Sequence, residues 1–169
     1  MKLMIAAYFF LFQLVAYGQD TNTDSCDIYL LSLAKRIEKK NYPVVIKFEF
    51  RMSESLLSGL ESSNLIDSEI LGQLKSQQNR FTFTKKACDK VRSLFIDQKV
   101  YNNASTLEEY VLINLAEPIF TNESEAYLFF DHLIMITGRG VAGGGSILQI
   151  FCKKDEQWYI KSTDILEMY

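Results

Sequence analysis

Three long apolar runs close to the carboxyl end constrain this chain more than any other feature. Residues 126–137 and 146–152 are rich in Ile, Leu and Phe, and a glycine-rich stretch separates them. A charged turn, residues 153–157, leads into the third run, residues 158–162. Apolar runs of this kind, separated by turn residues and with no helical segment between them, are typical of antiparallel strands. We therefore predict a C-terminal β-meander.

The preceding part of the chain begins with a helical pattern. A helix is predicted from Asp24 to about Lys40, with Pro43 preventing its continuation. Apolar residues recur every three or four positions within it, at Cys26, Leu30, Leu33 and Ile37. Residues 44–51 then alternate between apolar and polar, which predicts a strand with one face exposed to water.

The middle of the chain is less regular. A serine-rich stretch, residues 53–63, precedes a second predicted helix that Asn64 caps and whose apolar residues are Ile66, Ile70 and Leu74. Residues 85–95 show helical spacing but have strand-like residues on both sides. A strand is predicted over residues 110–115, ended by Pro118. Together these patterns predict an α+β fold, with N-terminal helices packed on a mostly antiparallel sheet.

The amino terminus indicates export. Lys2 precedes an apolar run, residues 3–15, and small residues follow at Ala16 and Gly18. A membrane span needs about 20 apolar residues, and this run is shorter. We predict a signal peptide of residues 1–18, a single domain of residues 19–169, a secreted or periplasmic location, and no membrane insertion after cleavage.

The charge of the mature chain disfavours a nucleic-acid partner. Removal of residues 1–18 takes away one charged residue, Lys2, so the formal net charge changes from −3 to −4. No block of five or six basic residues occurs. A protein with mild negative charge and no basic cluster lacks the electrostatic attraction on which phosphate binding depends.

The three cysteines are Cys26, Cys88 and Cys152, and an exported protein meets conditions in which a disulfide persists. If one disulfide forms, we expect it to join Cys26 to Cys88. Both lie on apolar helical faces that must pack on the same sheet. Strand alternation places Cys152 with Leu148 and Ile150, which predicts a buried thiol.

The stretch 138–143 matches the GxGxxG string of dinucleotide-binding proteins, but its context does not. That fingerprint requires a helix after the glycines, whose amino terminus receives the pyrophosphate. Here the next residues, 146–151, have strand character. We expect a flexible or bulged hairpin link over Gly138–Gly145, with a small anion-binding nest around Arg139 as the alternative.

The single histidine, His132, follows Asp131 directly. Neighbouring side chains of a strand point to opposite faces, so the two do not form an Asp-His pair unless the backbone is bulged. The strand over residues 126–137 is longer than usual, and we expect a bulge or bend near this polar pair. One histidine cannot build a histidine-rich zinc site, so no metal site is predicted.

Residues 115–120 (LAEPIF), 126–130 (AYLFF) and 138–160 (GRGVAGGGSILQIFCKKDEQWYI) together resemble the C-terminal part of small exported proteins of Bacteroidota-type bacteria that have no assigned function. In those proteins a proline turn, a strand, a glycine-rich link, a strand, a two-lysine turn and a tryptophan-containing strand follow in this order. This chain has residues 155–157 (DEQ) where the simplest form of that turn has Asn-Gly. The resemblance implies a strand pattern and brings no activity, cofactor or catalytic residue with it.

We interpret the chain as an exported binding domain that acts without catalysis on an unknown protein or small ligand. No catalytic residue and no cofactor are predicted. The candidate contact residues are Asp131, His132, Arg139, Gly140 and Gly143. Two alternatives remain at this point: an envelope hydrolase that uses Asp131 and His132, and an inhibitor or immunity-type protein that presents residues 138–145.

Overall fold

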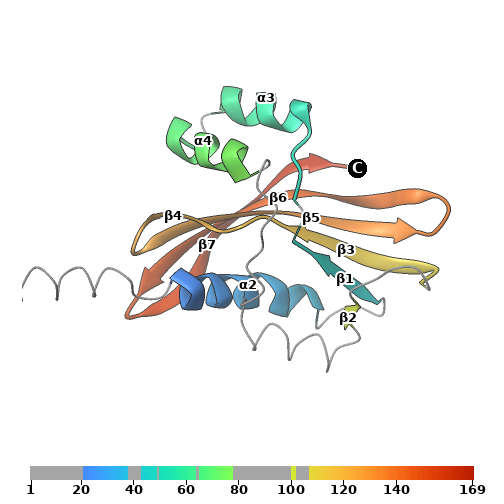
Figure 1. Ribbon diagram of the computed structural model, residues 1–169, viewed down its shortest axis with the longest axis horizontal. Coiled ribbons are helices and arrows are strands. Elements are labelled where there is room, and N and C mark those ends of the chain that lie inside the picture. The colour runs from blue at the N-terminus through green and yellow to red at the C-terminus, as the bar shows by residue number, and fades with distance from the viewer. Residues whose placement is uncertain (1–20, 38–42, 49, 64, 78–99, 102–106) are drawn as a thin grey trace, which may run out of the picture.

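The computed structural model describes residues 21–37, 43–48, 50–63, 65–77, 100–101 and 107–169. These residues form a mixed β-sheet that has helices on both of its faces (Figure 1). In chain order the elements are α2 (Thr21–Ile37), β1 (Val44–Lys47), α3 (Glu54–Ser63), α4 (Ser68–Gln77), β2 (Val100–Tyr101), β3 (Glu109–Leu115), β4 (Ile119–Asn122), β5 (Glu125–Ile136), β6 (Gly140–Lys154) and β7 (Gln157–Met168).

The strands lie in the order β2-β1-β3-β5-β6-β7, and β4 pairs with the part of β5 that β3 does not reach. β1 runs parallel to β2 and β3, and the other described pairings are antiparallel. The predicted α+β class and the C-terminal β-meander are therefore confirmed. Pro118 lies between β3 and β4, at the break that the sequence predicted.

Helices cover both faces of the sheet, so the chain has two apolar cores. α2 packs on one face, here called the α2 face, and α3 and α4 lie on the opposite face, here called the α3-α4 face (Figure 1). β5 supplies both cores in alternation: Leu128 and Phe130 lie in the first and Phe129 lies in the second, all fully buried. A strand that is buried on both faces needs a continuous apolar run, which is what residues 126–130 provide.

The prediction that residues 44–51 form a strand with one wet face was wrong. β1 ends at Lys47, and Val44, Val45 and Ile46 are all buried. β1 is an internal strand with a parallel neighbour on each side, so both of its faces are covered. Beyond its end, Phe48 packs against the core of the α2 face and Phe50 lies in the other core.

The predicted first helix exists as α2, and Leu33 is buried as predicted, but the centre of its buried face is shifted. Its deeply buried residues are Ile28, Tyr29, Ser32 and Leu33, whereas Cys26 and Leu30 are half-buried. The phenol of Tyr29 donates a hydrogen bond to the carbonyl of Ala116 at 3.1 Å. Ser32 donates to Oε1 of Gln149 at 2.7 Å, so its hydroxyl is satisfied inside the core. The buried face of α2 thus combines apolar side chains with polar groups that are hydrogen-bonded inside the core.

Of the two helices on the α3-α4 face, α4 was predicted from the sequence and α3 was not. α4 buries Ile70 and Leu74 as predicted, but its cap is Asp67 and not Asn64, since Oδ1 of Asp67 accepts from the amide of Ile70 at 2.8 Å. α3 was not predicted, because serines suggested a connecting stretch. Ser53 caps it, its hydroxyl accepting from the amide of Leu56 at 3.1 Å. Residues 85–95 and Cys88 lie outside the described residues.

Candidate functional site

Asp131 and His132 lie side by side on β5 and face opposite sides of the sheet. Asp131 lies on the α3-α4 face, where Ser146 donates to its Oδ1 at 2.7 Å and Asn114 donates to its Oδ2 at 3.3 Å. His132 pairs in register with Ile113, which belongs to the core of the α2 face. The two side chains therefore do not form an Asp-His pair.

The bulge expected near Asp131 and His132 lies elsewhere. β5 pairs with β3 in continuous register from Glu109 opposite Ile136 to Leu115 opposite Phe130. Its register with β6 shifts later, between Ile134 and Met135, where β6 carries one additional residue. The prediction was wrong in position because β3 and β6 both pair with β5 through the polar dipeptide, so its polarity does not interrupt the strand.

Arg139 occupies the turn of the β5-β6 hairpin, where its amide donates to the carbonyl of Ile136 at 3.0 Å. The turn is formed by residues 137–139, and β6 begins at Gly140. Gly140 and Gly143 therefore belong to a paired strand, so the flexible link expected over 138–145 was wrong. The bulged hairpin that was the other form of this expectation is present, because β6 carries an additional residue opposite Ile134 and Met135, and Gly138 and Gly140 have positive φ angles. A strand also follows the GxGxxG string, as expected, so the helix that a dinucleotide site requires does not follow these glycines.

The glycines of β6 allow neighbouring backbones to come close. A Cβ on Gly144 would lie 2.1 Å from the carbonyl oxygen of His132, and Gly144 has a φ of 124°. A Cβ on Gly145 would lie 2.2 Å from the carbonyl oxygen of Glu167. Gly143, in contrast, has no atom within 4 Å of such a Cβ. Two of these glycines are thus required by strand packing on either side of β6.

Four adjacent strands place polar side chains in one row on the α3-α4 face. Asn114 on β3 is opposite Asp131 on β5, Asp131 is opposite Ser146 on β6, and Ser146 is opposite Glu167 on β7. The row continues because the hydroxyl of Tyr169 donates to Oε2 of Glu167 at 3.0 Å and lies 3.3 Å from the Ser146 hydroxyl.

Burial governs the electrostatics of this row. Asp131 is 8% exposed, and desolvation raises the pKa of its carboxyl group above the ordinary range. Hydrogen bonds from Ser146 and Asn114 act in the opposite direction, and the charge of Glu167 raises the pKa further. Burial likewise raises the pKa of Tyr169. Asp131 accepts hydrogen bonds from Asn114 on β3 and Ser146 on β6, so the row joins four neighbouring strands.

The row ends at α3. Two hydroxyls from the start of this helix donate to the Glu167 carboxylate, Ser53 to Oε2 and Ser55 to Oε1, both at 3.2 Å. Beside this contact lies a groove of about 220 Å³ between α3 and the last part of β7. Leu56 and Leu60 line it from α3, and Ile165 lines it from β7. Figure 1 shows α3 above the end of β7.

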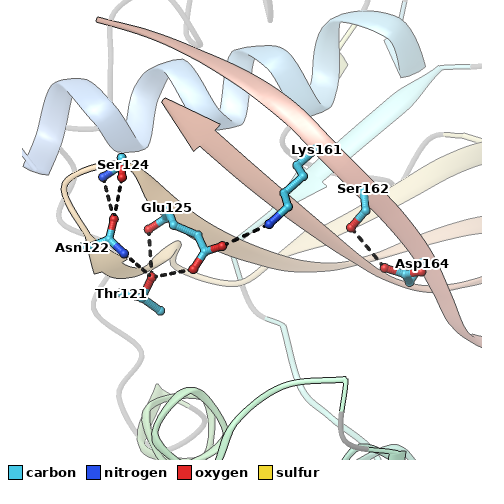
Figure 2. A network of polar contacts seen from close by, with 7 residues as sticks. All are labelled: Thr121, Asn122, Ser124, Glu125, Lys161, Ser162 and Asp164. Atoms are coloured by element: carbon cyan, nitrogen blue, oxygen red, sulfur yellow. Dashed lines mark hydrogen bonds and ion pairs between the residues drawn. The ribbon is translucent and has the colours of Figure 1, made fainter. Parts of the chain in front are cut away.

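The opposite end of the sheet is polar and internally bonded (Figure 2). At the β4-β5 turn, Oδ1 of Asn122 accepts from the amide of Ser124 at 2.8 Å and from its hydroxyl at 2.9 Å. The carboxylate of Glu125 accepts from the Thr121 hydroxyl at 3.1 Å and forms an ion pair with Lys161 at 3.5 Å. These side chains bond to one another across the β4-β5 turn.

The structure describes two of the three cysteines. Cys26 and Cys152 are both half-buried, so the prediction of a buried Cys152 thiol was wrong, and the described residues contain no disulfide. The predicted Cys26-Cys88 pairing stays a prediction, because Cys88 lies outside the described ranges. Among the residues that the structure describes, no cluster of three His, Cys, Asp or Glu side chains has a metal-binding arrangement. No helix in that part of the chain is long and apolar enough to span a bilayer.

Comparisons with protein-family models, with curated proteins and with solved structures found no match to this chain. The site is therefore described from its own geometry. Of the predicted contact residues, Arg139, Gly140 and Gly143 lie together on one hairpin, while Asp131 and His132 are divided between the two faces of the sheet.

The groove was not predicted from the sequence. Its β7 side comes from residues 165–167, and its helical side comes from α3. The helix α3 was not predicted because its sequence is rich in serine. A usable signal was present in the pair Leu56 and Leu60, which are four residues apart after the capping residue Ser53. Their spacing marks an amphipathic helix that must cover part of the sheet.

Proposed function

We propose that this protein is an exported binding domain that engages a partner protein without catalysis. The observation that carries the proposal is the distribution of exposed apolar side chains. The large apolar residues that are exposed in the described part of the chain are Leu65, Val141, Tyr159, Ile165, Met168 and Tyr169. All except Tyr159 belong to the hairpin end, defined as residues 137–145, residues 165–169, and Leu65 of the adjoining groove.

Exposure at the hairpin end is considerable for side chains of this size. Ile165 is 65% exposed and Met168 is 78% exposed. Single exposed apolar residues are ordinary, but a group of them in one region marks an interaction surface. The polar β4-β5 turn at the other end (Figure 2) gives a contrast within the same sheet. This asymmetry supports binding through the hairpin end.

The polar residues that were considered for catalysis have structural contacts. Asp131 accepts hydrogen bonds from two neighbouring strands, and His132 lies on the other face. A general acid and base must reach the same reacting group. The separation of Asp131 from His132 therefore supports a binding role over the alternative of a hydrolase that uses both.

Export is supported by the apolar run of residues 3–15 and by the small residues before Gln19. Expression of the full chain in a secreting host, followed by intact-mass measurement of the exported protein, tests it. The expected product begins at Gln19. A membrane-retained product that still contains residues 1–18 contradicts it.

Site-specific photo-crosslinking tests the binding surface. A benzoyl-phenylalanine in place of Met168 is expected to give one discrete crosslinked product in cells of the source. The same substitution at Tyr159 is the control, because Tyr159 is an exposed aromatic residue of the same strand outside the hairpin end. Equal crosslinking at the two positions, or no product at Met168, overturns the proposal.

A second candidate is an inhibitor or immunity-type protein that inserts the β5-β6 turn into an enzyme. Two observations favour it. Residues 137–142 are exposed at the end of the hairpin, and the amide of Thr137 donates a hydrogen bond to the carbonyl of Glu108, directly before β3. A preorganised turn loses little entropy on binding. Arg139→Glu should then abolish crosslinking from Met168. Ile165→Lys should leave that crosslinking unchanged if the turn alone makes the contact.

A further inference from the structure

The volume of the groove between α3 and β7 favours a single side chain as its occupant over a whole small-molecule ligand. Its volume is about 220 Å³. Pockets that enclose a small-molecule ligand or cofactor commonly measure roughly 300–1,000 Å³. A volume below that range suits one large side chain of a peptide, since the rest of the peptide lies outside the groove.

The walls of the groove are apolar and open to solvent. Leu56 and Leu60 are buried at its base, while Leu65 is exposed and Leu166 is half-buried beside them. An apolar side chain placed between them would remove the last two from water, at roughly 25 cal/mol per Å² of apolar surface buried. The groove therefore selects an aliphatic or aromatic side chain.

Glu167 supplies the charge of the groove. It is the single charged side chain among the described residues that line it. Its carboxylate accepts from the hydroxyls of Ser53, Ser55 and Tyr169, all of them neutral donors. No described lysine or arginine lies within ion-pair distance of it. A fixed carboxylate that neutral donors orient is complementary to a cationic side chain of a partner.

β7 provides a backbone along which a peptide can lie. It is the last strand in the sheet order, and β6 is its one partner in the described ladder. β7 spans twelve residues, about twice the usual strand length. An extended segment can join the edge of such a strand through main-chain hydrogen bonds, while alternate side chains enter neighbouring pockets.

From this geometry we infer that the α3-β7 groove binds an extended peptide segment of a partner protein, with an apolar side chain in the groove and a basic side chain two residues away on Glu167. Residues two apart in a strand lie on the same face, about 7 Å from one another. This inference rests on the proposed binding function and names the chemistry of the partner.

The test uses the mature chain and a fluorescein-labelled probe peptide, Ser-Lys-Thr-Leu-Thr-Lys-Ser, in a fluorescence-anisotropy titration. Lysines on both sides of the leucine allow either strand direction. The matched peptides replace both lysines with glutamate, or the leucine with serine. The lysine-leucine probe is expected to bind about tenfold more tightly than either control peptide, at low ionic strength.

Protein variants identify the site. Glu167→Gln keeps the shape of the side chain and one acceptor oxygen, and it removes the charge. It should weaken binding of the lysine-leucine probe about fivefold and should not weaken binding of the glutamate peptide. Leu65→Lys, at an exposed position beside the groove, should abolish binding. Tyr159→Ser on the same strand is the control and should bind as the parent does.

Each outcome decides the inference. It is overturned if the three peptides bind equally, if the lysine-leucine probe does not bind, or if Glu167→Gln and Leu65→Lys bind it as the parent does. Melting curves of the variants identify any loss of fold, and Leu65→Ser provides a second groove variant outside the helices and strands. A discrete crosslink from Met168 together with failure of the peptide leaves the proposed function in place and removes the peptide chemistry alone.

Discussion

Asp24 in the first turn of α2 accepts a hydrogen bond on Oδ1 from the indole nitrogen of Trp158 on β7, at 2.9 Å. The same oxygen accepts from the ammonium group of Lys153 at 3.0 Å. The ammonium group also lies 5.4 Å from the centre of the Trp158 ring. These contacts join the start of α2 to the β6-β7 hairpin, 134 residues further along the chain.

Replacement of Trp158 should be the most destabilising single change at this junction. Trp158 is 6% exposed and packs edge-on against Phe120, so Trp158→Ala should lower the free energy of unfolding by about 3–5 kcal/mol. Urea unfolding measures it. Trp158→Phe, which keeps much of the packing and loses the bond to Asp24, should cost less. A Trp158→Ala protein as stable as the parent would contradict this account of the core.

Glycine substitutions should distinguish required glycines from permissive ones. Gly144→Ala and Gly145→Ala place a Cβ within 2.2 Å of a neighbouring carbonyl oxygen, so each should destabilise the sheet by roughly 2 kcal/mol or more. Gly143→Ala has open space and is the matched control on the same strand. Thermal melting of the three variants provides the comparison. Equal melting temperatures for Gly143→Ala and Gly145→Ala would refute the close approach of β6 to β7.

The buried carboxyl group of Asp131 should make stability depend on pH. Its pKa is raised in the folded protein, above the ordinary value of 3.8, so the folded state holds the proton more tightly than the unfolded state. The stabilisation is complete below the ordinary value and is lost as the pH rises through the raised value. Asp131→Asn does not titrate at this position. The melting temperature of the variant minus that of the parent should therefore increase from about pH 3.5 to pH 7.

A second variant checks the cause of that pH dependence. Ser146→Ala removes the 2.7 Å hydrogen bond that lowers the pKa of Asp131, so the loss of stability should occur at higher pH than in the parent. Melting curves across the same pH range measure the shift. An unchanged or opposite shift would show that Ser146 does not control the charge of Asp131.

The buried bond between Ser32 and Gln149 should contribute measurably to stability. Ser32→Ala leaves Oε1 of Gln149 without its 2.7 Å donor inside the core, at a cost of about 1–3 kcal/mol. The double variant Ser32→Ala with Gln149→Leu removes both polar groups and should recover part of that loss. Chemical denaturation of the single and double variants measures the coupling, and strictly additive effects would argue against the bond.

The apolar pattern of the sequence was sufficient to predict the meander. The runs that became β5, β6 and β7 have the composition of strands, and the third run, which begins at Trp158, contributes to the core. The same holds for α4, because Ile70 and Leu74 repeat at helical spacing. Local periodicity reports which element forms, since it reflects the geometry of the backbone itself.

The role of the glycines in residues 138–145 was interpreted incorrectly, and the reason is physical. Five glycines in residues 138–145 indicate a flexible link when only local entropy is considered. In the structure β5 and β7 approach β6 so closely that Gly144 and Gly145 cannot carry a side chain. That requirement comes from strands that are distant in sequence, so local composition does not reveal it.

By itself, the sequence determined the α+β class and the antiparallel meander of its last three strands, because both follow from backbone period and side-chain alternation. The tertiary structure alone decided which residues meet. Helices on both faces turned β1 into a buried strand, and the row from Asn114 to Glu167 arose from cross-strand register. The groove exists because α3 lies over β7, although the two elements are about a hundred residues apart in the sequence. Their contact depends on packing and on the hydrogen bonds that Ser53 and Ser55 donate to Glu167, and no local sequence pattern encodes either of these.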